Sequence, residues 1–128
     1  MNILNIHHIE LTVSDLKKSI SFYSKLPGFK IVAKYSNFVM FFNDHFYLGI
    51  TDHEGKTEKG KFSEFNLGLD HVSFEVESKN DLEEALKFFD KENIKHGEIK
   101  KLSNNLYVLA FRDPDNIQLE LCWKEKTK

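Results

Sequence analysis

The sequence has little of several features that define common protein classes. A single cysteine, Cys122, excludes an internal disulfide framework, and the lack of any Cys-x-x-Cys spacing leaves the reducing cytoplasm as the expected location. No apolar run approaches the roughly 20 residues of a membrane-spanning helix, and the first residues do not resemble a signal peptide. The 18 basic residues are balanced by 20 acidic ones, so no basic field for nucleic acid exists. We therefore expect neither nucleic acid nor a membrane as a partner.

The chain does have enough apolar material for one folded domain. Hydrophobic residues make up 41% of the 128 positions and include 12 phenylalanines. A polar stretch with two glycines and no sustained period lies near the middle, which is typical of a connection. We expect a single domain, 1–128, with module one at about 5–52, the connection at about 53–67 and module two at about 68–124.

A short stretch near the start of the chain recurs 63 positions later. His8-Ile-Glu-Leu-Thr-Val13 reappears as His71-Val-Ser-Phe-Glu-Val76, and both alternate polar with apolar residues. This period of two predicts strands with one buried face. Each strand is followed by an amphipathic helical pattern, for which Ser14 and Asn80 are the expected N-terminal caps.

Three further strands are expected in each module. They lie at about Phe29–Lys34, Asn37–Phe42 and His45–Thr51 in the first module, and at about His96–Lys100, Leu106–Arg112 and Ile117–Trp123 in the second. Each module therefore reads β-α-β-β-β, which predicts an α+β fold.

Two histidines and a glutamate recur on the polar faces of three of these strands. The polar residues are His8, Glu10 and Thr12; His71, Ser73 and Glu75; and Gln118, Glu120 and Cys122. Two neutral imidazoles and one carboxylate leave coordination positions open on a divalent cation, as catalytic metals require. The alternative is that these are ordinary solvent-facing residues. His7 is the adjacent competitor, but strict alternation places it on the opposite face, with Ile9.

The pattern resembles the vicinal oxygen chelate superfamily. The resemblance is carried by His8-Ile-Glu-Leu-Thr-Val-Ser-Asp-Leu16, by Ser21-Phe-Tyr23 and by Phe111-Arg-Asp-Pro-Asp-Asn-Ile-Gln-Leu-Glu-Leu121. That superfamily includes lactoylglutathione lyases, methylmalonyl-CoA epimerases, extradiol dioxygenases, fosfomycin-resistance transferases and bleomycin-binding proteins. The resemblance implies an incomplete eight-stranded barrel around a central cleft, commonly in a homodimer. It also implies that His8, His71 and Glu120 are the metal ligands.

The chain departs from the four-ligand members of that superfamily at one position. Gly49 falls where the lyases and epimerases place a glutamate or glutamine, and a glycine has no side chain to bind metal or take a proton. This leaves Glu120 as a ligand and the most obvious base. Glu10, on the same strand face as His8, is either a substitute base or ligand, or a charged residue at the cleft rim.

These features together predict an enzyme that acts on a small molecule. We expect manganese, iron, nickel, cobalt or zinc as the metal, polarising a substrate with vicinal oxygens in a lyase, isomerase, transferase or dioxygenase reaction. Glu120 and Glu10 are the candidate catalytic residues. The alternative is a non-catalytic drug-binding protein of the bleomycin-resistance kind, which the presence of all three ligand residues disfavours.

Overall fold

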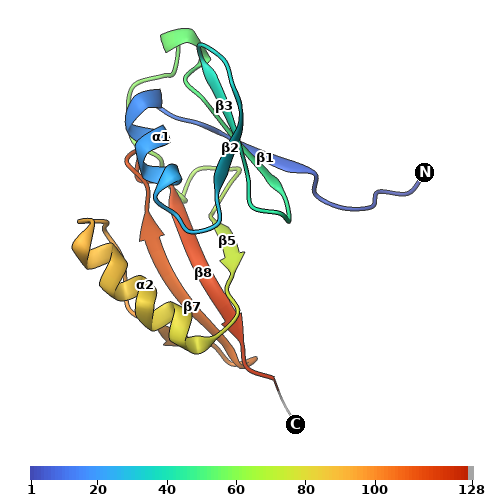
Figure 1. Ribbon diagram of the computed structural model, residues 1–128, viewed down its shortest axis with the longest axis vertical. Helices are drawn as coiled ribbons and strands as arrows, with labels where there is room; N and C mark the ends of the chain where they lie inside the picture. Colours follow the sequence, from blue (N-terminus) through green and yellow to red (C-terminus); the bar gives the residue numbers. More distant parts are fainter. Residues whose placement is uncertain (127–128) are drawn as a thin grey trace. The chain divides into compact units, whose positions relative to one another are not determined.

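The fold consists of two units with the same order of elements (Figure 1). The computed structural model describes residues 1–126, and the chain divides into compact units between Gly60 and Lys61. The first unit contains β1 (His8–Thr12), α1 (Leu16–Ser24), β2 (Lys30–Lys34), β3 (Phe38–Phe42), β4 (Tyr47–Thr51) and a short 3-10 turn, η1 (His53–Gly55). The second contains β5 (Val72–Glu75), α2 (Lys79–Lys91), β6 (Lys100–Lys101), β7 (Leu106–Arg112) and β8 (Gln118–Lys124). The predicted β-α-β-β-β modules are confirmed, although β6 is much shorter than predicted.

Each unit builds one four-stranded sheet. The strand orders are β1-β4-β3-β2 and β5-β8-β7-β6, so the first strand of each module lies beside the last. These two neighbours are parallel, and the other pairs are antiparallel. The described strands therefore form two separate sheets that are not closed into one barrel. The α+β class is confirmed, and the shared central cleft stays a prediction.

One helix covers one face of each sheet, and the core of each unit lies in that layer. Figure 1 shows α2 running along β7 and β8, and α1 lies against its own sheet. The largest fully buried side chains include Tyr23, Phe41, Leu48 and Ile50 in the first unit, and Leu82, Phe89, Leu109, Phe111 and Leu119 in the second. The alternate strand residues consequently lie on the face away from the helix. Across residues 1–126, no helix is both long and apolar enough to cross a membrane.

The helix caps differ from those predicted. Asp15, and not Ser14, caps α1, because its carboxylate accepts a hydrogen bond from the Lys18 backbone N–H at 3.1 Å. Ser78, and not Asn80, caps α2. Its hydroxyl accepts from the Asp81 N–H at 3.2 Å, and the Asp81 carboxylate accepts from the Ser78 N–H at 3.0 Å. This reciprocal pair is a capping box in which an aspartate takes the place of the more usual glutamate.

The last part of the predicted connection is fastened to the second unit. The Phe62 N–H donates to the Asp115 carbonyl at 2.9 Å, and the Asn116 side chain donates to the Phe62 carbonyl at 3.1 Å. The Arg112 guanidinium donates to both carboxylate oxygens of Glu64, at 2.8 and 3.0 Å. Hydrogen bonding by Arg112 lowers the pKa of Glu64 to about 2. The second unit thus begins before its first strand.

Replacing Ser78 by alanine should lower the free energy of unfolding by about 1 kcal/mol, because the first turn of α2 loses its hydrogen-bond acceptor. The matched control is Asn80→Ala, at an exposed position inside α2, which should change the free energy by less than about 0.5 kcal/mol. Urea denaturation followed by circular dichroism measures both. A loss in Asn80→Ala equal to that in Ser78→Ala would contradict the assignment of the cap.

Acid should destabilise the fold through Glu64. Its pKa of about 2 in the folded chain lies below the ordinary value of 4.5, so folding favours the ionised form. The ion pair therefore stabilises the fold fully above about pH 4.5, and this contribution disappears as the pH falls toward 2. Glu64→Gln should flatten the loss of thermal stability in that range. Glu58→Gln, which removes an exposed carboxylate, should leave the slope as it is, and an unchanged slope in Glu64→Gln would refute the assignment.

Candidate metal centre

The three predicted metal ligands are divided between the two units. His8 is the first residue of β1, His71 directly precedes β5, and Glu120 lies in β8. Among the residues that the structure describes, no group of three or more His, Cys, Asp or Glu side chains is arranged to hold a metal ion. Each unit therefore holds one part of the predicted centre.

The second unit brings two of the predicted ligands together. The parallel pairing of β5 with β8 sets Ser73 opposite Glu120, so His71 lies close to the same carboxylate. The His71 Nε2 atom lies 3.8 Å from Glu120 Oε1, and the Ser73 hydroxyl donates to that oxygen at 2.8 Å. A separation of 3.8 Å is too long for a hydrogen bond. It exceeds by a few tenths of an ångström the roughly 3.4 Å between two donors that each lie about 2.1 Å from one tetrahedral cation, so a small side-chain movement would let both atoms bind one ion.

Asp70 determines which nitrogen of His71 is available. Its Oδ1 atom lies 2.7 Å from His71 Nδ1. An ionised carboxylate can only accept, so Nδ1 carries the hydrogen of this bond, and in the neutral ring Nε2 keeps its lone pair. That lone pair is on the side of the ring near Glu120. In metal-binding histidines of proteins, a carboxylate commonly accepts from the ring nitrogen that does not bind the metal, and Asp70 has this place beside His71.

The first unit holds His8 in a different way. His8 pairs with Tyr47 across β1 and β4, and its Nδ1 atom lies 2.9 Å from Nδ1 of His7. The His7 ring also stacks on Tyr47, with ring centroids 5.1 Å apart. The prediction that His7 faces away from His8 is therefore wrong. His7 precedes the first residue of β1, so strand alternation does not govern its side chain.

Gly49 occupies the place in the first unit that Glu120 occupies in the second. Glu10 lies opposite Gly49 in the β1–β4 register, just as Ser73 lies opposite Glu120. A Cβ atom at Gly49 would meet the Phe38 ring at 2.9 Å and Glu10 Cγ at 3.2 Å. The side chains of Phe38 and Glu10 thus fill the space above the glycine. Glu10 brings a carboxylate to this place from the neighbouring strand.

A third histidine, which was not among the predicted site residues, reaches the polar face of β1. His53 follows β4 in the 3-10 turn, and its Nε2 atom lies 3.0 Å from the Thr12 hydroxyl. Thr12 shares a strand face with His8 and Glu10. The signal that could have located His53 is its position two residues after Thr51, which lies opposite Thr12 in the register.

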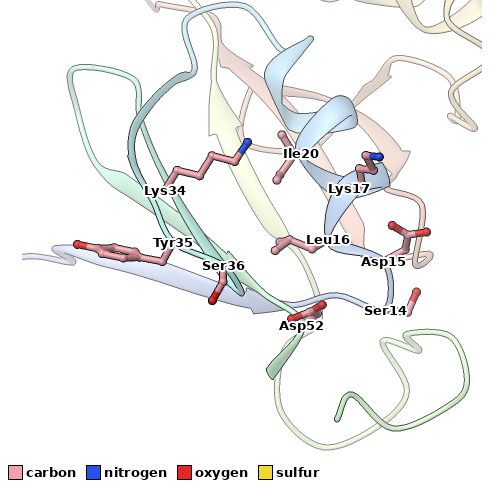
Figure 2. A pocket seen from close by; sticks show the side chains of 9 residues that line it. All are labelled: Ser14, Asp15, Leu16, Lys17, Ile20, Lys34, Tyr35, Ser36 and Asp52. Carbon is pink, nitrogen blue, oxygen red and sulfur yellow. The ribbon is translucent and has the colours of Figure 1, made fainter. Parts of the chain in front are cut away.

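A separate pocket of about 470 Å³ opens at the start of α1 (Figure 2). Figure 2 shows the Lys34 side chain extending toward Ile20 of the helix. Lys34 pairs with Val39, which is fully buried, so this pocket lies on the helix-covered face of the sheet. It is not lined by Glu10 or by any of the three predicted ligands.

Comparison with known proteins gives consistent matches along the chain. A protein of Bacillus subtilis (strain 168), YqjT, is 29% identical over 129 residues, covering 91% of this chain and 96% of its own. A glyoxylase/bleomycin resistance protein/dioxygenase domain from Frankia sp. EAN1pec has a TM-score of 0.85 at 29% identity, covering 97% of this chain and 100% of that one.

More distant structures share the fold alone. The fosfomycin resistance protein FosX from Listeria monocytogenes has a TM-score of 0.77 at 20% identity, covering 97% of this chain and 96% of that one. The model of one family matches residues 5–121, which is nearly the whole chain. The chain belongs to the Glyoxalase/Bleomycin resistance protein/Dioxygenase superfamily.

Proposed function

We propose that this chain is a divalent-metal-dependent enzyme that acts on a small molecule with neighbouring oxygen atoms. In this proposal His8, His71 and Glu120 hold the metal. The observation that carries it is the pair formed by His71 Nε2 and Glu120 Oε1, 3.8 Å apart, with Asp70 holding the other nitrogen of the ring. The alternative is that these are ordinary solvent-facing residues, since the side chains of His71 and Asp70 are 38% and 67% exposed.

The donor set fits a catalytic metal. Two imidazoles and one carboxylate bind manganese, iron, cobalt, nickel or zinc, and they leave positions for water or substrate. His71 and Glu120 supply two donors from one unit, and His8 supplies the third from the first unit of the same chain or of a second copy in a homodimer. A bound metal would act as a Lewis acid on a substrate oxygen.

In this proposal the two carboxylates have different roles: Glu120 binds the metal and Glu10 accepts a proton. Glu120 accepts a hydrogen bond from Ser73, which fixes its Oε1 atom and suits it to ligation. Glu10 is the better base, because ligation would withdraw charge from Glu120 while Glu10 keeps its own. Its position above Gly49 corresponds to that of Glu120 in the other unit. Glu10 would accept a substrate proton, and lyase, isomerase, transferase and dioxygenase reactions all remain compatible with this arrangement.

One observation favours a second function, the binding of an apolar drug without catalysis. A half-buried row of Phe38, Met40 and Phe42 lies on the same sheet face as Glu10, and Tyr47 stacks on Phe42 with ring centroids 4.5 Å apart. Together with the glycine in place of a carboxylate, this row offers an apolar surface to a ligand. The ordered His71–Glu120 pair favours the metal enzyme over this second function.

Metal analysis of the purified chain distinguishes these two functions. After dialysis against each of the five metals, the wild type should retain stoichiometric metal, and His71→Ala, Glu120→Ala and His8→Ala should lose it, because each variant removes a donor atom. The control is His45→Ala, at an exposed turn position, which should retain the metal. Absence of bound metal in the wild type, or full retention in His71→Ala, would overturn the proposed function.

A further inference from the structure

The residue before each predicted metal-binding histidine contacts the same ring nitrogen. Asp70 lies 2.7 Å from Nδ1 of His71, and His7 lies 2.9 Å from Nδ1 of His8. His7 and Asp70 are themselves separated by the 63 positions that relate the two histidines in the repeat. The contact is therefore made twice, at equivalent places, by residues of different chemistry.

In the second unit, a chain of hydrogen bonds holds Asp70. The Gln118 side-chain amide donates to Asp70 Oδ1 at 3.0 Å and to the Asp70 carbonyl at 3.2 Å. Arg112, which can only donate, donates to Gln118 Oε1 at 3.3 Å, and this fixes the orientation of the amide. Arg112 is held in turn by its ion pair with Glu64. The carboxylate beside His71 is thus anchored through three side chains.

In the first unit, aromatic stacking takes the place of these hydrogen bonds. Phe42 pairs with Tyr47 at the turn between β3 and β4, just as Arg112 pairs with Gln118 between β7 and β8. Tyr47 stacks on Phe42 at 4.5 Å and on His7 at 5.1 Å, measured between ring centroids. Equivalent positions in the two units therefore support the residue before the histidine, by stacked aromatic rings in the first unit and by hydrogen bonds in the second.

We propose that Asp70 and His7 are positioning residues, which hold His71 and His8 with Nε2 directed to the metal. This inference rests on the proposed function. In this role Asp70 accepts as an anion within a hydrogen-bond network, and His7 would accept through its Nδ1 atom as a neutral ring. Charge-assisted hydrogen bonds are roughly twice as strong as neutral ones. The second unit is therefore the more strongly preorganised half of the centre, and it makes the larger contribution to metal affinity.

Calorimetric titration of the full chain with Zn²⁺ tests the affinity. Asp70→Ala should weaken binding about 10–100-fold, as the loss of an outer partner of a metal-bound histidine does. His7→Phe keeps a ring to stack on Tyr47 but removes the nitrogen, and it should weaken binding about 3–10-fold. Asp70→Asn, which keeps an acceptor oxygen, should restore part of the loss. The matched control, Glu98→Ala, removes an exposed carboxylate and should bind as the wild type does.

Long-range ¹H–¹⁵N correlation on the metal-free chain distinguishes a positioning role from a merely structural one, because it reports which nitrogen of each imidazole carries the hydrogen. His71 should carry its hydrogen on Nδ1 in the wild type and in Asp70→Asn, and should lose this preference in Asp70→Ala. Unchanged tautomers, or unchanged Zn²⁺ affinity in Asp70→Ala, would overturn the positioning role. If the wild type binds no metal, the proposed function fails, and the tautomers alone then decide whether Asp70 orients His71.

Discussion

The parallel pairing of the first and last strands in each module is the constraint on which the rest of the structure depends. It sets Glu10 opposite Gly49 in one unit and Ser73 opposite Glu120 in the other. Because the helix covers one face of the sheet, the residues that alternate with the core share the other face. In the second unit, His71 directly before β5 is therefore brought close to Glu120 of β8. Without this pairing, His71 and Glu120 would be unrelated positions, far apart in the sequence.

The two modules use one framework with different chemistry. In the second unit, Glu64 pairs with Arg112, Arg112 donates to the Gln118 amide, and this amide donates to the Asp70 carboxylate. Each of these bonds restricts the orientation of the next side chain. In the first unit, stacked rings support His7, and stacking constrains direction less than hydrogen bonds do. The two units also differ in the strand that carries the carboxylate. Glu120 belongs to the last strand of its unit, whereas Glu10 belongs to the first strand and its side chain lies over Gly49. In the proposed metal centre, the second unit is therefore the half with the more restricted ligand geometry.

The sequence predicted the modules and the faces of the strands, because alternation and helical periodicity are local and the repeat supports each assignment. The predictions failed where a side chain has several possible partners nearby and only the folded backbone determines which one it contacts. Ser14 and Asp15 are both good caps, and only the backbone geometry selected Asp15. Alternation misplaced His7, since the strand begins one residue later. The ion pair of Arg112 with Glu64 spans 48 positions, and no local pattern indicates it.

The most direct test of the central claim is anomalous diffraction from crystals of the full chain grown with Zn²⁺ or Mn²⁺. The account predicts one strong anomalous peak at about 2.0–2.3 Å from His71 Nε2 and from a Glu120 carboxylate oxygen, with His8 Nε2 as a further ligand. Asp70 should remain hydrogen-bonded to His71 Nδ1 in the same crystals. A peak bound through His71 Nδ1, or a metal held by other residues while His71 and Glu120 stay unligated, would contradict it.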